Sequence, residues 1–155
     1  MNYNPEQRII ELGLVLPPAP KPVGVYKPVL VSQNLLYISG QGPVQNDGTL
    51  ISGKVGSDLT LEEGKAAARQ VGLTMIAIIK EHFGDMNRIS RLIKTLGMVN
   101  CAPGFYGAPA VINGFSELMA EIFGEENGIG VRSAVGMILP SNIAAEIEAI
   151  FELKS

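Results

Sequence analysis

Ala145-Glu146-Ile147-Glu148-Ala149-Ile150-Phe151-Glu152-Leu153 is the segment that says most about the architecture of this chain. Successive residues of a strand point to opposite faces of a sheet, so strict alternation of apolar and polar residues identifies a half-buried strand. One face here is wholly apolar (Ile147, Ala149, Phe151 and Leu153), and the other carries Glu146, Glu148, Ile150 and Glu152. The alternation predicts a strand whose apolar face is covered by other elements of the chain.

A long amphipathic helix is predicted upstream of this strand. Thr60-Leu61-Glu62-Glu63 has the form of a capping box, in which the threonine and the glutamate three residues later satisfy free N–H groups. Apolar residues then recur at steps of three and four, which gives a core-facing stripe of Ala68, Val71, Met75, Ile79 and Phe83. We expect the helix to end at Gly84-Asp85.

The remaining pattern completes the sheet and adds one further helix. We predict strands near Val29–Val31 and Leu35–Ser39, a short strand at Ile51–Val55, and strands at Ile89–Val99 and around Arg132, with a helix from Pro109 to Phe123. The order ββ(β)αβαββ predicts an α+β fold, a mixed sheet with the two main helices packed on one face. The other face of the sheet then needs a cover, and we expect a second copy of the chain to supply it.

The N-terminal segment differs in composition from the rest of the chain. Asn4-Pro5-Glu6-Gln7 is typical of a helix start, and Gly13 is expected to end that helix. Four prolines between Leu16 and Pro22 indicate an extended arm. We therefore divide the chain into a helix and proline-rich arm, residues 1–22, and one main domain, residues 23–155.

Composition limits the classes of function. Charged residues make up only 17% of the 155-residue chain, so some apolar surface is expected to be covered by another subunit. The net charge of −3 and the absence of basic runs argue against a nucleic-acid partner. Cys101 is the only cysteine, which fits a reducing cytoplasm, and no signal peptide is recognisable. The most apolar run, Val71 to Ile79, is too short to cross a membrane.

Arg132 is the only cation between Lys94 and Lys154, and it lies in a strongly apolar stretch. A guanidinium in such surroundings needs a specific partner, and a carboxylate held by two parallel hydrogen bonds is the best one. We expect the last strand to form a hairpin with the Arg132 strand. The partner is then either Glu146 or Glu148 of the chain, in a structural salt bridge, or the carboxylate of a ligand, and the residues alone leave these alternatives open.

Few other residues are candidates for chemistry. One histidine, His82, and one cysteine do not make a metal site, and both are expected to be passive. Ser39-Gly40-Gln41-Gly42-Pro43 either forms a tight turn or lets the backbone approach a ligand closely.

A set of short motifs resembles one known family when taken in order along the chain. These are Gly24-Val25-Tyr26, Tyr37-Ile38-Ser39-Gly40-Gln41, Ala68-Arg69-Gln70, Lys94-Thr95, Val111-Ile112-Asn113, Arg132-Ser133, Leu139-Pro140 and Glu146-Ile147-Glu148. From about Tyr26 to its end the chain is similar to the YjgF/RidA family, the reactive-intermediate deaminases once labelled endoribonuclease L-PSP.

The resemblance implies a fold, an assembly and an activity. The implied fold is the chorismate-mutase-like α+β fold, in a homotrimer with a cleft at each subunit interface. Active members hydrolyse 2-imino acids, or their enamine tautomers, to 2-keto acids and ammonia, without a metal or organic cofactor. By resemblance, Arg132 clamps the substrate carboxylate and Glu146 positions or activates water, while the cleft is lined by Tyr26, Ser39, Gly40 and Asn113.

The chain also departs from the family pattern. Ala134 stands where many members have a cysteine, although its backbone N–H can still donate to a ligand. The segment from Arg132 to Pro140 is one residue shorter than in the best-known members of the family, which is expected to shift the strand register or remove a bulge.

Two other functions are considered: a trimer that binds a small carboxylate or keto acid without turnover, and an endoribonuclease or translation inhibitor. The net negative charge of the chain and its lack of a pair of histidines argue against the endoribonuclease or translation inhibitor.

Overall fold

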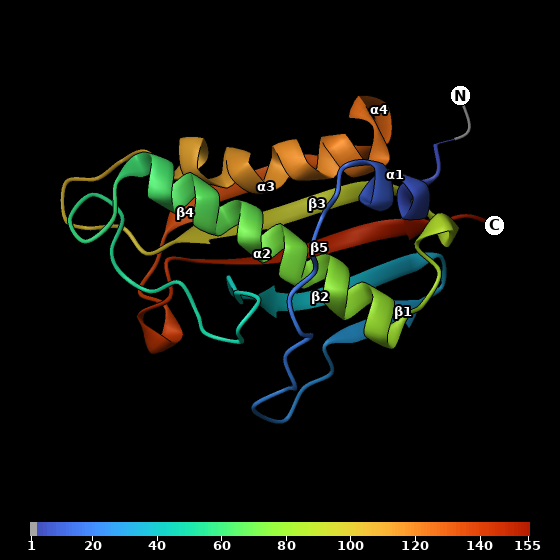
Figure 1. The fold of residues 1–155 in the computed structure, drawn as a ribbon, viewed down its shortest axis with the longest axis horizontal. Coiled ribbons are helices and arrows are strands. Elements are labelled where there is room, and N and C mark those ends of the chain that lie inside the picture. Colours follow the sequence, from blue (N-terminus) through green and yellow to red (C-terminus); the bar gives the residue numbers. More distant parts are fainter. Residues whose placement is uncertain (1–2) are drawn as a thin grey trace.

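The protein forms a two-layer α+β structure, seen here in a computed structural model that describes residues 3–155 (Figure 1). The strands are β1 (Val29–Ser32), β2 (Leu35–Gln41), β3 (Ile89–Val99), β4 (Val131–Gly136) and β5 (Ala145–Leu153). The helices are α1 (Pro5–Glu11), α2 (Leu61–His82), α3 (Ala108–Phe123) and α4 (Glu125–Gly128), with short 3-10 turns at Met86–Arg88 and Pro140–Asn142. The strand order in the sheet is β1-β2-β5-β3-β4.

The predicted capping box opens α2. The Thr60 side chain accepts a hydrogen bond from the Glu63 N–H at 3.1 Å, and the Thr60 N–H donates to the Glu63 carboxylate at 2.9 Å. Reciprocal bonds of this kind satisfy N–H groups that the first turn of a helix leaves free. The helix ends at His82, with Phe83 as its C-cap, so the predicted bounds are confirmed.

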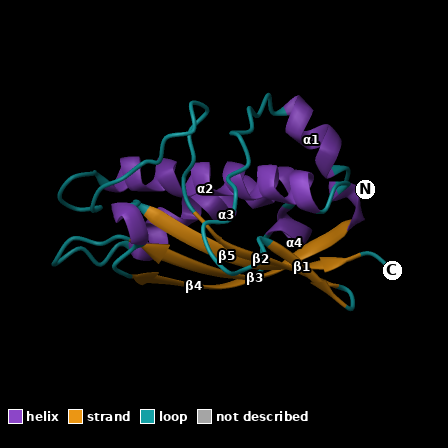
Figure 2. Ribbon diagram, turned by 90° about the horizontal axis from the view of Figure 1, so that it is seen from below, coloured by secondary structure: helices purple, strands orange, loops and turns teal. Residues whose placement is uncertain are grey.

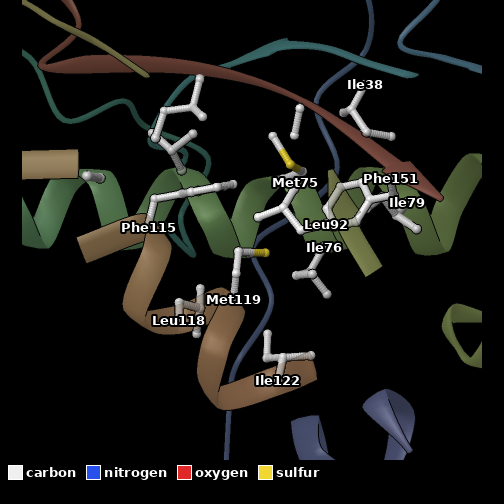
Figure 3. Close-up of a cluster of buried hydrophobic side chains, with 14 of the residues drawn as sticks. Ile38, Met75, Ile76, Ile79, Leu92, Phe115, Leu118, Met119, Ile122 and Phe151 are labelled. Atoms are coloured by element: carbon white, nitrogen blue, oxygen red, sulfur yellow. The ribbon is translucent and has the colours of Figure 1, made fainter. Parts of the chain in front are cut away.

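The alternation in β5 places its apolar side chains in the core. Ile147 and Phe151 are fully buried, and Glu148 is exposed. Figure 3 shows Phe151 directed toward Met75 and Ile79 of α2, with Phe115 and Met119 of α3 completing the cluster. Because every second residue of a strand lies on the same face of the sheet, this packing also places Glu146 on the opposite face.

Both long helices cover the same face of the sheet, as predicted (Figure 2). No helix of the described residues lies on the opposite face, which we call the open face. Apolar side chains of β1, β2 and β4 are exposed there, among them Leu30, Tyr37, Val131 and Val135. An exposed apolar sheet face of this kind favours association with another subunit.

Two sequence expectations are wrong. Ile51–Val55 is not a strand, because its residues make only isolated bridges, such as Ser52 with Ile143. β4 and β5 do not form a hairpin either, because β3 lies between them and pairs with β4 in parallel and with β5 antiparallel. The pairing of β3 with β4 is continuous from Lys94–Val131 to Val99–Gly136, while the irregularities of the sheet lie in the β2–β5 and β3–β5 pairings.

The N-terminal helix is docked on the main domain. Ile9 of α1 is buried in the core, and the Arg8 guanidinium donates to the Glu121 carbonyl of α3 at 3.2 Å. The Glu6 carboxylate accepts from the Met86 N–H at 3.0 Å and pairs with Lys80 at 2.6 Å. The expected start of this helix at Asn4-Pro5 is confirmed. None of the helices described between residues 3 and 155 has the length and apolar character needed to cross a membrane.

Candidate functional site

The Arg132 guanidinium is held by neutral acceptors of α3. Its Nη1 donates to the Ser116 hydroxyl at 3.0 Å, and its Nη2 donates to the Pro109 carbonyl at 3.2 Å. Among residues 3–155 no carboxylate lies within 4.0 Å of its nitrogens, so the alternative of an internal salt bridge to Glu146 or Glu148 is wrong for the single chain. A guanidinium has five N–H donors, and most of them remain free for a ligand.

Arg132 opens onto a cavity of about 440 Å³, which we call the arginine cavity. Its walls come from α3, from the chain that follows α3 and from the edge of the sheet, and include Asn113, Ser116, Glu117, Glu125 and Thr95. Asn113 and Ser116 are three residues apart, so they lie on the same face of α3. The structure thus brings together Arg132 and Asn113, two of the residues predicted to line one cleft.

Ser116 was not among the predicted site residues, yet it orients the arginine. Replacing it with alanine removes one of the two acceptors that fix the guanidinium. If Arg132 binds the carboxylate of a substrate, as the resemblance implies, Ser116→Ala should raise the KM several-fold, which corresponds to roughly 1 kcal/mol, with a smaller effect on kcat. Ser116→Thr keeps the hydroxyl and should restore KM, while Ser57→Ala, in an exposed loop, serves as control. An unchanged KM in Ser116→Ala contradicts this orienting role.

Glu146 lies on the open face of β5, directly opposite Met98 of β3. Burial raises the pKa of its carboxyl above the ordinary value of 4.5, and the charge of Glu148 on the same face raises the pKa further. A half-buried carboxylate with a raised pKa is a candidate for general acid–base work. Within residues 3–155 no salt bridge neutralises it.

The backbone at Gly40 lies against the Glu146 carboxylate. A Cβ atom added at Gly40 would stand 2.5 Å from Glu146 Oε2, so any side chain here would displace the acid. Gly40 falls in the irregular part of the β2–β5 pairing, between Ile38 and Gln41. Ser39, Gly40 and Gln41 belong to β2, so the tight-turn interpretation does not hold for them, and the backbone at Gly40 approaches a carboxylate of the protein itself.

Tyr26 and Ser39 surround Gly40 from the side of the N-terminal arm. The Ser39 hydroxyl donates to the Lys27 carbonyl at 2.6 Å and fastens the Tyr26 loop to β2. Tyr26 is 51% exposed, and it lines a cavity of about 210 Å³ together with Gly40 and Pro140. Gly40 thus follows Ser39 in the chain, lines the cavity of Tyr26 and lies against the Glu146 carboxylate. We call Tyr26, Ser39, Gly40 and Glu146 the glutamate group.

Arg132 and Glu146 lie on opposite faces of one sheet. Arg132 is paired with Thr95, whose side chain is buried on the helix side, whereas Glu146 is paired with Met98. Paired residues share a face and successive residues alternate, so Thr95 and Met98 point to opposite faces. Ala134 is paired with Gly97 and lies on the same face as Arg132. The expectation that a hairpin brings Arg132 and Glu146 into one cleft of the same chain is wrong.

Neither His82 nor Cys101 lines the arginine cavity. His82 is exposed at the end of α2. Burial raises the pKa of the Cys101 thiol, which disfavours the reactive thiolate. Within the described residues, no three side chains of the types that bind metals gather at one point.

Comparison with known proteins agrees with this architecture. The profile of the family described as "YjgF/chorismate mutase-like, putative endoribonuclease" matches residues 6–147. Protein TCP17 of Trypanosoma cruzi is 38% identical over 145 residues, which is 93% of this chain and 91% of that protein. The crystal structure of an Agrobacterium tumefaciens protein of unknown function is 39% identical, with a TM-score of 0.86, and the match covers 97% of this chain and 94% of that one. RidA from an Antarctic Psychrobacter species is 27% identical, with a TM-score of 0.60, over 87% of this chain and 94% of its own.

Proposed function

The chain belongs to the YjgF/RidA family, and from this premise we propose that it hydrolyses 2-imino acids and their enamine tautomers to 2-keto acids and ammonia. The proposed assembly is a homotrimer in which the arginine cavity of one copy meets the glutamate group of the next. The observation that carries the proposal is the placement of Arg132 and Glu146 on opposite faces of one sheet. A cleft that uses both residues can be completed only by a second copy.

The proposed chemistry needs an anchor, a water and a proton carrier. Arg132 binds the substrate carboxylate through N–H groups that Ser116 and Pro109 leave free. The Glu146 carboxylate accepts a proton from water as the oxygen of that water adds to the imine carbon. The protonated carboxyl passes this proton to the nitrogen, which completes a carbinolamine. The carboxylate then takes the hydroxyl proton of the carbinolamine and delivers it to the amino nitrogen, so that the C–N bond breaks, ammonia leaves and the keto group forms.

The remaining members of the site shape the cleft. Tyr26 and Asn113 offer hydrogen-bonding groups beside the reacting atoms, and Gly40 leaves room for the Glu146 carboxylate. The backbone N–H groups near Ala134 provide further donors. All of the proton transfers are assigned to side chains and water, and no metal or organic cofactor is part of the proposal.

A complementation experiment tests whether the cleft is shared between copies. Arg132→Ala and Glu146→Gln are each expected to be inactive, and the two chains carry different affinity tags. In a mixed trimer purified through both tags, one cleft of three combines an intact arginine with an intact glutamate. We therefore expect about a third of the wild-type rate of ammonia release. Mixed assemblies as inactive as their parents would show that each cleft belongs to a single chain.

The raised pKa of Glu146 sets the pH dependence. The carboxylate is the base, so kcat/KM is expected to fall as the pH drops through this pKa, with an acid limb above pH 4.5. Stability is expected to change with pH in the opposite direction from activity. Glu146 holds its proton more tightly in the folded state than in the unfolded state. The free energy of unfolding therefore decreases as the pH rises from the pKa of this carboxyl in the unfolded chain through its pKa in the folded protein.

The variant Glu148→Gln checks the assignment of the acid limb. It removes the neighbouring charge that helps to raise the pKa of Glu146, so the acid limb of the kcat/KM profile should move to lower pH. An acid limb that does not move in this variant contradicts Glu146 as the titrating group.

A further inference from the structure

Asn100 is a buried amide outside both cavities of the proposed site. It directly follows β3 and is 1% exposed, and it lines neither the arginine cavity nor the cavity beside Tyr26. An amide buried in this way needs hydrogen-bond partners from the protein, because its donors and its acceptor are cut off from bulk water. Its partners therefore show which parts of the chain it holds together.

The Asn100 side chain joins two segments that lie far apart in the sequence. Its Nδ2 donates to the Asn142 Oδ1 at 2.9 Å, to the Asn142 carbonyl at 3.3 Å and to the Gly53 carbonyl at 3.2 Å. Its Oδ1 accepts from the Lys54 ammonium group at 3.1 Å. The Gly53 N–H also donates to the Asn142 carbonyl at 2.8 Å. The end of β3, the segment around Gly53 and the turn before β5 thus meet at one side chain.

The turn that Asn100 contacts has a backbone conformation that its residues do not favour. Ser141 and Asn142 both have φ in the left-handed region, at 55° and 53°. Residues with a Cβ atom seldom adopt this region, and they persist there where the surrounding structure holds them. The bonds from Asn100 to Asn142 are such a constraint, so loss of the Asn100 side chain should let the turn relax.

The same turn borders the proposed site. Pro140 and Ser141 line the cavity that also contains Gly40, whose backbone lies against the Glu146 carboxylate. β5 follows the turn closely, and Glu146 is its second residue. A change in the turn therefore moves a wall of this cavity and the start of the strand that carries the proposed base.

We propose that Asn100 is a positioning residue of the site: it holds the Pro140–Asn142 turn and thereby fixes where β5 presents Glu146. The inference rests on the proposed function, in which Glu146 is the base. Arg132 lies on β4 and is held by α3, so the anchor for the substrate carboxylate does not depend on Asn100. The role of Asn100 should therefore appear in kcat rather than in KM.

Replacing Asn100 with alanine removes every hydrogen bond of its side chain. We expect kcat for imine hydrolysis to fall roughly ten- to a hundredfold, as misplacement of a reacting group can cause, while KM changes by less than about twofold. Initial rates of ammonia release over a range of imine concentrations measure both quantities. An unchanged kcat, or a loss of kcat/KM that comes from KM alone, overturns the inference.

The control for a general loss of stability is Met86→Ala. Met86 is fully buried in the 3-10 turn before β3, at the opposite end of that strand from Asn100. Assayed well below the melting temperature of each variant, Met86→Ala should keep the kcat of the wild type. A similar loss of kcat in both variants would show that Asn100 acts only through stability, and it would overturn the positioning role.

Two variants of Asn142 test the same contact from the exposed side of the turn, where folding is less at risk. Asn142→Ala and Asn142→Gly both remove the side-chain acceptor of the Asn100 amide. Glycine adopts a positive φ without a steric penalty and alanine does not, so kcat should be roughly threefold or more lower for Asn142→Ala than for Asn142→Gly. Equal kcat values in these two variants contradict the inference.

Hydrogen exchange separates failure of this inference from failure of the proposed function. If the wild-type protein releases no ammonia from any imine, the proposed function fails, but the hold of Asn100 on the turn can still be measured. Backbone amides of residues 141–146 should exchange faster in Asn100→Ala than in the wild type, while those in the middle of α2 keep their protection. Unchanged exchange in residues 141–146 overturns the inference whatever the activity.

Discussion

Replacing Glu146 with glutamine is expected to lower the rate of imine hydrolysis about a hundredfold or more, while a 2-keto acid still binds. Glutamine keeps the size of the side chain against Gly40, but it cannot take a proton from water. Proton transfer by a positioned side chain contributes roughly two to four orders of magnitude to a rate. Single-turnover ammonia release and calorimetric binding of a short 2-keto acid measure the two effects separately.

The control for this variant is Glu148→Gln, which removes the neighbouring carboxylate of the same strand face. It should retain most of the kcat at neutral pH. If Glu146→Gln keeps the wild-type rate, the water is activated by another group. If the wild-type protein binds the keto acid but releases no ammonia from any imine, the protein is a non-catalytic carboxylate-binding member of the family.

Replacing Arg132 with alanine is expected to lower kcat/KM by ten- to a hundredfold or more, because a charge-assisted contact contributes roughly 1.5–3 kcal/mol. The melting temperature should hardly change. The guanidinium is exposed, and its partners are a hydroxyl and a carbonyl rather than a carboxylate, so no charge is left unpaired in the variant. Thermal unfolding and ligand titration on the same sample measure both quantities.

Arg132→Lys is the informative companion variant. It retains the positive charge but loses the planar arrangement of donors that holds a carboxylate with two bonds, so we expect only partial recovery of affinity. A large fall in melting temperature for Arg132→Ala, with ligand affinity retained, would indicate instead that the arginine is structural.

Local sequence signals were sufficient to predict most of the helices and strands. The capping box at Thr60 and the alternation of β5 each act through neighbours within a few residues, and both elements lie where the sequence predicts. The Ile51–Val55 prediction failed because strand propensity does not supply a partner strand; the bridges of this segment go to single residues. The expected hairpin of β4 and β5 failed because adjacency along the chain does not decide which strands are neighbours in the sheet.

Prediction of the candidate site is limited in the same way, because the contacts that form it join residues far apart in the sequence. The resemblance to the family indicated Arg132, Glu146 and the residues around them, but not which of these residues one chain brings together. The partners of Arg132 are 16 and 23 residues away in sequence, and they reach it only because α3 packs beside β4. Ser116 could have been suspected from its spacing of three from Asn113 on the same helix face. The hydrogen bond itself depends on tertiary packing.

The order of strands in the sheet affects how the protein can fold during its synthesis on the ribosome. β5 is the last strand to be synthesised, yet it lies in the middle of the sheet between β2 and β3. Until it emerges, the hairpin of β1 and β2 and the unit formed by β3, α3 and β4 have no strand to join them, so cooperative folding must await the emergence of β5. Nascent chains stalled before residue 145 should therefore be digested readily by protease, and stop codons before this residue should prevent formation of the sheet.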